Sequence, residues 1–198
     1  MSNSNYPKAW SRFTSQNRTS NNIDKYARWA ARFRLAKSFK GLDLGDHYIG
    51  QDTPKLYSAI SRIFLTYSAF EEYCSSIGIN PKKEDDVKVL EDEESQKATI
   101  QTIRELDPQN AFSGFLEKHL IRGNKLMMQS FLNGQDVNVS FLAKSTRHVF
   151  AHGVLAAHST NLSSECFEKI SQIIANFLLD CMDQHFDKNV PDNHVLIG

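Results

Sequence analysis

Apolar residues recur every three or four positions over residues 52–77, which is the spacing of one face of an α-helix. Asp52-Thr53-Pro54 is typical of a helix start, and Gly78 marks the end of this helix. An advance of about 100° per residue places Glu71 within the apolar face and directs Glu72 away from it. The apolar face comprises Leu56, Ile60, Ile63, Phe64, Tyr67, Phe70 and Cys74.

Two further segments show the same periodicity. Residues 23–40 contain good helix formers, and a long last helix is predicted to begin at Ser163 or Ser164. The apolar positions are Tyr26, Trp29, Ala30 and Phe33 in the first segment and Phe167, Ile170, Ile174, Phe177, Leu178 and Cys181 in the second. His185 continues the apolar face of the last helix, so we expect it to be a satisfied core or interface residue.

Shorter helices are predicted between these long ones. They cover residues 108–119, 125–132 and 138–153. Asn138 or Ser140 can cap the third of them, and a glycine follows each of the last two. No strand-like alternation stands out, so the chain is predicted to be helical throughout.

The expected fold is all-α, an antiparallel bundle of four to five main helices with an N-terminal helical extension. Residues 1–50 are assigned to a basic arm and an extra helix, 51–190 to the bundle and 191–198 to a C-terminal tail. Residues 1–22, rich in Ser, Asn, Thr and Arg, are expected to be disordered or an arm. The acidic segment 84–94 is expected to be a loop or an exposed helix.

Composition narrows the class of protein. Apolar residues make up 40% of the 198 residues, which is enough for a sizeable core. The chain has no apolar run of transmembrane length, and its N-terminus lacks the apolar core of a secretory signal. Cys74, Cys166 and Cys181 are widely spaced, which predicts reduced and buried thiols. We therefore expect a cytoplasmic protein that makes no membrane contact.

The charges are unevenly distributed although the net charge is zero. Residues 1–40 hold nine lysines and arginines against the single acid Asp24, so the remainder of the chain carries the balancing negative charge. A basic arm of this kind can contact phosphate. The alternative is that the N-terminal segment packs on the acidic remainder of its own chain.

The most informative chemical signal is the segment Arg147-His148-Val149-Phe150-Ala151-His152-Gly153. On a helical wheel, Arg147, His148 and His152 lie opposite the apolar positions of the 138–153 helix, together with Lys144. Arginine is a permanent cation with a planar fork of donors, and histidine exchanges protons near neutral pH. This combination suits attack of an RNA 2′-hydroxyl on the adjacent phosphorus, which needs a base, a proton donor and positive charge but no metal.

The same segment resembles the R-x(4–6)-H signature of the HEPN superfamily, whose name refers to higher eukaryotes and prokaryotes, nucleotide-binding. The position after the arginine is commonly Asn, Asp or His in that family, and His148 stands there in this chain. The stretch Leu65-Thr66-Tyr67-Ser68-Ala69-Phe70-Glu71-Glu72-Tyr73 is similar to an early core helix of such domains. The resemblance covers about residues 53–187 and implies a HEPN-like helical bundle.

Many HEPN proteins are metal-independent endoribonucleases that act as toxins or in defence and RNA processing. The resemblance implies that His152 is the general base, that Arg147 clamps the phosphate and that His148 assists. It also implies a homodimer, because the family forms a composite site across a two-fold interface. Helical geometry agrees with this, since residues five apart lie about 140° apart around a helix and about 7.5 Å apart along it. The expected partner is RNA, and no cofactor is expected.

Two other roles are weighed for these residues. His148 and His152 have the i, i+4 spacing of a metal pair, but no motif identifies which of His158, Cys166 or Glu71 would be a third ligand. No metal site is therefore predicted. Glu71 is unusual on an apolar face, because carboxylates are rarely buried without a partner. One hypothesis is that Glu71 orients Arg147 or a histidine. The other is that Glu71 is half-exposed at the helix end or pairs with a structural lysine.

The alternative to an enzyme is a non-catalytic helical module that binds protein or nucleic acid. In that case Arg147 and His152 stabilise the dimer face. A third possibility is an effector domain controlled by a regulatory protein that docks on the acidic segment 84–94.

Overall fold

The computed structural model describes residues 5–16, 22–45, 52–151 and 163–189, and in this part of the chain the secondary structure is entirely helical. The expected all-α bundle is therefore confirmed. The helices are α1 (Trp10–Gln16), α2 (Asn22–Ser38), α3 (Asp52–Ile77), α4 (Glu84–Val87), α5 (Glu93–Leu106), α6 (Ala111–His119), α7 (Arg122–Leu132), α8 (Val139–Ala151) and α9 (Ser164–Asn189).

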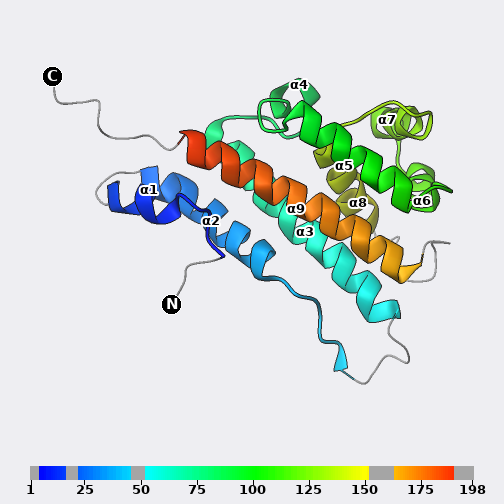
Figure 1. Cartoon of the computed structure of the whole chain (residues 1–198), viewed down its shortest axis with the longest axis horizontal. Coiled ribbons are helices and arrows are strands. Elements are labelled where there is room, and N and C mark those ends of the chain that lie inside the picture. Colours follow the sequence, from blue (N-terminus) through cyan, green and yellow to red (C-terminus); the bar gives the residue numbers. More distant parts are fainter. Residues whose placement is uncertain (1–4, 17–21, 46–51, 152–162, 190–198) are drawn as a thin grey trace.

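The two longest helices, α3 and α9, lie side by side at the centre of the bundle (Figure 1). They run parallel to each other. Ser164 at the start of α9 donates to Asp52 at the start of α3, and Tyr73 near the end of α3 lies 2.7 Å from His185 near the end of α9. The antiparallel arrangement predicted from short links therefore applies to the neighbours of this pair and not to the pair itself.

The other long helices run against the central pair. Ser76 at the end of α3 donates to the carbonyl of Lys25 near the start of α2, so these two helices are antiparallel. Helix α8 is antiparallel to α9, because Phe150 at the end of α8 packs on Phe167 at the start of α9. None of the helices in the described ranges is long and apolar enough to cross a membrane.

The predicted apolar faces of α2, α3 and α9 are largely confirmed. Trp29 and Phe33 of α2 are fully buried, and the predicted positions of α9 are all buried. Gly78 has a φ of 78° and ends α3 as expected, because glycine tolerates this left-handed conformation. Phe64 is the exception on α3, since its side chain remains 39% exposed beside α8.

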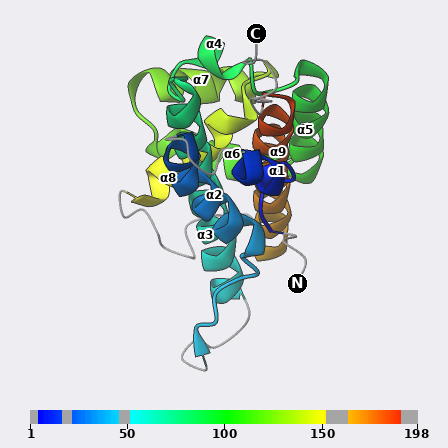
Figure 2. The same cartoon turned by 90° about the vertical axis from the view of Figure 1, so that its left-hand side faces the viewer.

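Residues 5–16 pack on the bundle, which corrects for these residues the expectation that the segment 1–22 is disordered or an arm. Residues 10–16 form α1, and its Phe13 is fully buried in the core shared by the long helices. Figure 2 shows α1 and α2 in front of the long helices. Phe13 makes edge contacts with Tyr26 and with Phe186, so aromatic packing anchors the segment.

Ion pairs reinforce this packing. Lys8 pairs with the buried Asp183 at 3.7 Å, and Arg12 pairs with Asp187 at 3.2 Å. Arg32 of α2 pairs with Glu72 of α3 at 3.3 Å. The alternative that the basic segment packs on acidic residues of its own chain is thus confirmed for these side chains. Glu72 was expected to point away, but α2 covers this side of α3 and leaves only 19% of its side chain exposed.

The acidic segment 84–94 is only partly a loop or exposed helix. It forms the short α4 and the start of α5, and residues 93–106 are a helix that the periodicity did not predict. Glu91 within it is 4% exposed, and its carboxylate accepts hydrogen bonds from the backbone N–H groups of Val139 and Ser140. Glu91, rather than the expected Asn138 or Ser140 side chain, therefore satisfies the first N–H groups of α8.

Helix α1 provides a test of the N-terminal packing. We expect Phe13→Ala to lower the free energy of unfolding by about 3–5 kcal/mol, because it leaves a cavity among buried aromatic rings. Ser11→Ala, at an exposed position of the same helix, is the matched control and should change stability by less than about 0.5 kcal/mol. Urea denaturation measures both; equal stability of the two variants would contradict the packing of α1.

Glu91 should make stability depend on pH. Burial raises the pKa of Glu91 from 4.5 to about 7, although its backbone hydrogen bonds favour the charged form. Between these two values the folded protein holds a proton that the unfolded chain has lost, so stability falls as the pH rises from about 4.5 to about 7. We expect the unfolding free energy of the wild type minus that of Glu91→Gln to decrease across this window. Parallel pH curves for the two proteins would contradict this prediction.

Candidate functional site

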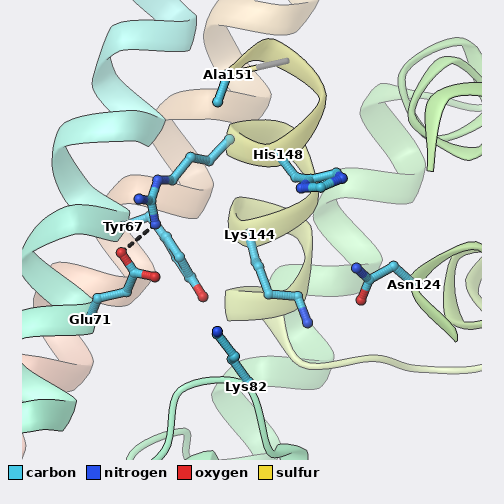
Figure 3. A pocket seen from close by; sticks show the side chains of 8 residues that line it. Tyr67, Glu71, Lys82, Asn124, Lys144, His148 and Ala151 are labelled. Carbon is cyan, nitrogen blue, oxygen red and sulfur yellow. Dashed lines mark hydrogen bonds and ion pairs between the residues drawn. The ribbon is translucent and has the colours of Figure 1, made fainter. Parts of the chain in front are cut away.

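The polar side of α8 forms one wall of an open cavity with a volume of about 600 Å³. The buried positions of α8 include Val139, Leu142, Val149 and Phe150, as the helical wheel predicted. The opposite side of α8 therefore faces the cavity. The lining residues are Tyr67, Glu71, Lys82, Asn124, Lys144, Arg147, His148 and Ala151 (Figure 3).

Arg147 is held in place by side chains of α3. Its guanidinium forms an ion pair and hydrogen bond with Glu71, drawn as a dashed line in Figure 3. The guanidinium carbon also lies 5.2 Å from the ring centre of Phe64 and 5.5 Å from that of Tyr67, within cation–π range. Its side chain is 33% exposed, so the group is fixed yet still reachable from solvent.

Glu71 makes the contact that one of the sequence hypotheses expected, because its carboxylate binds Arg147. The neighbouring Glu72 binds Arg32 on the other side of α3. The two adjacent carboxylates thus tie α3 to two different helices. This explains why a carboxylate occurs beside an apolar face, since it is paired and not buried alone.

Tyr67 adds a neutral hydroxyl to the cavity wall. Burial raises the pKa of Tyr67, and the negative charge of Glu71 raises it further, whereas Arg147 acts in the opposite direction. The phenol therefore stays protonated at physiological pH. A protonated hydroxyl at this position can donate a hydrogen bond to a bound anion.

Lys144 lies one helical turn before Arg147 and His148 on the same side of α8. Its ammonium group is 5.3 Å from the ring centre of Phe141. Burial lowers the pKa of Lys144; Glu84 raises it, and Lys82 lowers it. The side chain is thus partly desolvated and lies within the electrostatic influence of a second lysine.

Lys82 and Asn124 reach the cavity from other parts of the chain. Lys82 belongs to the turn after α3, where its backbone N–H donates to the side chain of Asn80 at 3.0 Å. Asn124 lies in the first turn of α7, whose N-terminus contributes a partial positive charge. In Figure 3, Lys82 approaches from below and extends toward Tyr67, whereas Lys144 approaches from above and extends toward Asn124.

The structure brings together three of the four predicted site residues: Arg147, His148 and Glu71. The fourth, His152, lies outside the described residues; in the sequence it directly follows Ala151, which lines the cavity. Gly153, the predicted end of the helix, and His158, one of the possible metal ligands, also lie outside them.

Other residues singled out in the sequence do not belong to this cavity. His185 is partly buried and shares a hydrogen bond with Tyr73, so its ring has a partner as expected. Cys166, half-buried rather than buried, donates to the carbonyl of Leu106 at 3.0 Å, away from Glu71. Within the described ranges no group of three or more histidine, cysteine or acidic side chains is arranged to hold a metal ion.

Sequence reasoning did not include Lys82, Lys144, Asn124 or Tyr67 in the site. Lys144 carried a usable signal, because its spacing of three and four residues from Arg147 and His148 places it on the same helical face. Lys82 and Asn124 carried no such sequence signal, because only the packing of separate elements brings them to α8.

Comparisons with protein-family models, with curated proteins and with solved structures found no match to this chain. The resemblance to the HEPN superfamily therefore depends on the motif at Arg147–His152 and on its helical context.

A double-mutant cycle tests the ion pair that positions Arg147. We expect Glu71→Gln and Arg147→Met to show a coupling energy of about 1 kcal/mol in the free energy of unfolding, because the two partly buried groups lose each other's charge. Urea denaturation of the wild type, both single variants and the double variant measures this coupling. Strictly additive effects would mean that the ion pair contributes nothing in solution.

Proposed function

We propose that this protein is a metal-independent endoribonuclease that acts as a homodimer and cleaves RNA by attack of the 2′-hydroxyl. The observation that carries the proposal is the gathering of Arg147 and His148 with two lysines around one open cavity. Such a group of donors suits an anionic substrate with several phosphate oxygens. The histidine motif adds groups that transfer protons near neutral pH.

In this mechanism Arg147 donates hydrogen bonds to the nonbridging oxygens of the scissile phosphate. Glu71 positions the guanidinium and does not touch the substrate. His152 takes the proton from the 2′-hydroxyl as that oxygen attacks phosphorus. The bond from phosphorus to the 5′-oxygen breaks, and a protonated group such as His148 supplies the proton for the leaving oxygen. The products are a 2′,3′-cyclic phosphate and a 5′-hydroxyl, and the charge on the phosphorane is stabilised by Arg147.

Helical geometry supports the proposal of a homodimer. If α8 continued through His152, that residue would lie about 140° around the helix axis from Arg147. One helix therefore does not direct both groups at a single phosphorus, whereas two facing copies do. Each of the two sites in a symmetric dimer then takes Arg147 from one protomer and His152 from its partner.

Cleavage without metal is the first test. We expect the purified protein to cut single-stranded RNA in the presence of EDTA, and Arg147→Ala and His152→Ala to reduce the rate by about 10²–10⁴-fold. Arg28→Ala and His119→Ala, which change exposed residues outside the cavity, are matched controls and should cut at the wild-type rate. Circular dichroism checks that each variant is folded.

The proposal fails if both motif variants cut as fast as the wild type. It also fails if the wild type cuts no RNA, and the non-catalytic binding module is then the better description.

Mixing the two inactive variants tests the composite site. If Arg147 and His152 act across the interface, a heterodimer of Arg147→Ala and His152→Ala regains one intact site. Random exchange of protomers then restores about one quarter of the wild-type activity. Sites contained within one chain would show no recovery, and sedimentation would have to show a dimer for the exchange to occur.

A further inference from the structure

One part of the cavity lining has no role in the mechanism proposed above. It is formed by Lys82, Lys144 and Asn124, which come from three different parts of the chain. In Figure 3 the Lys82 side chain extends toward Tyr67, and the Lys144 side chain extends toward Asn124. These groups are all hydrogen-bond donors, and the two lysines carry positive charge.

The placement of two ammonium groups near one another is unfavourable by itself. Burial of Lys144 disfavours its charged form, and the charge of Lys82 disfavours it further. Glu84 offsets part of this effect but does not line the cavity. An anion between the two lysines would reverse the sign of the interaction, because each ammonium group would then face a negative partner.

The charges of the residues that line the cavity also favour a bound anion. Of the described residues that line it, Lys82, Lys144 and Arg147 are cations, and Glu71, the one carboxylate among them, already pairs with Arg147. The two lysines have no acid among the lining residues. The first turn of α7, which carries Asn124, adds a partial positive charge at the same place.

We propose that Lys82, Lys144 and Asn124 form a second phosphate subsite, which binds the phosphate adjacent to the one clamped by Arg147. The assignment of this phosphate to an RNA strand rests on the proposed function. The subsite itself rests only on the three donors that line one cavity, so it is a separate claim.

The dimensions of the cavity suit two phosphates of one strand. A volume of about 600 Å³ is within the usual range of small-ligand pockets and exceeds what a single phosphate group needs. Lys144 lies three residues before Arg147, which corresponds to about 4.5 Å along the axis of α8. Adjacent phosphates of one strand are also separated by several ångströms.

Binding of an RNA that does not react tests the subsite independently of cleavage. The probe is a fluorescein-labelled single-stranded oligonucleotide with 2′-O-methyl groups, measured by fluorescence anisotropy at increasing salt. We expect Lys144→Met and Lys82→Met each to weaken binding by several-fold and to reduce the slope of log K against log salt by about 0.7, the value for one phosphate of a single strand. Lys83 is exposed, follows Lys82 in the chain and does not line the cavity. The control variant Lys83→Met should therefore bind like the wild type.

A second arm identifies the source of the phosphate. Inorganic pyrophosphate should compete with the oligonucleotide for the wild type and compete less well for Lys144→Met. Isothermal titration calorimetry with pyrophosphate alone measures its binding directly, and if that binding depends on Lys144 while the oligonucleotide does not bind, the assignment to RNA is overturned. Thermal unfolding of each lysine variant checks that the loss of binding does not come from loss of the fold.

The outcomes separate this proposal from the nuclease proposal. Wild-type binding and salt slope in both Lys82→Met and Lys144→Met would overturn the subsite, even if Arg147→Ala and His152→Ala abolish cleavage. Loss of binding in the lysine variants of a protein that cleaves no RNA would support the subsite and contradict the nuclease. Failure of the wild type to bind either probe would overturn the subsite.

Discussion

The burial of α3 between α2, α8 and α9 is the constraint on which the rest of the structure depends. These helices cover much of its surface, and the adjacent Glu71 and Glu72 bind arginines of two of them, Arg147 of α8 and Arg32 of α2. The same packing that builds the core therefore also orients the guanidinium at the candidate site.

The candidate site combines an arginine that is held by a carboxylate with lysines whose positive charge is less well balanced by nearby acids. Arg147 is paired and packed against aromatic rings, so its position is set before any ligand binds. Lys82 and Lys144 share the cavity with no carboxylate of their own among the lining residues. A preorganised donor next to uncompensated positive charge favours an anion that spans both places, and this is the physical basis of the RNA proposal.

Much of the fold followed from local periodicity, but its exceptions arose from tertiary contacts. Helix α5 was missed because its apolar face is narrow: residues 93–106 are mostly exposed and polar, with only Ile100 and Ile103 buried. Glu91 was assigned to a solvated acidic segment, whereas it caps α8 from a position 48 residues earlier in the chain. No local pattern distinguishes such a carboxylate from its exposed neighbours, because the distinction depends on where α8 lies.

The sequence by itself determined the helical class, the apolar faces of the long helices and the placing of Arg147 and His148 on the polar side of α8, because these features repeat with the geometry of a single helix. Only the tertiary structure decided that α3 and α9 are parallel, that Glu71 reaches Arg147 and that Lys82 and Asn124 join the cavity. Those features depend on distances between segments that are remote in the chain. Such distances are set by the packing of whole faces rather than by the residues nearby in sequence.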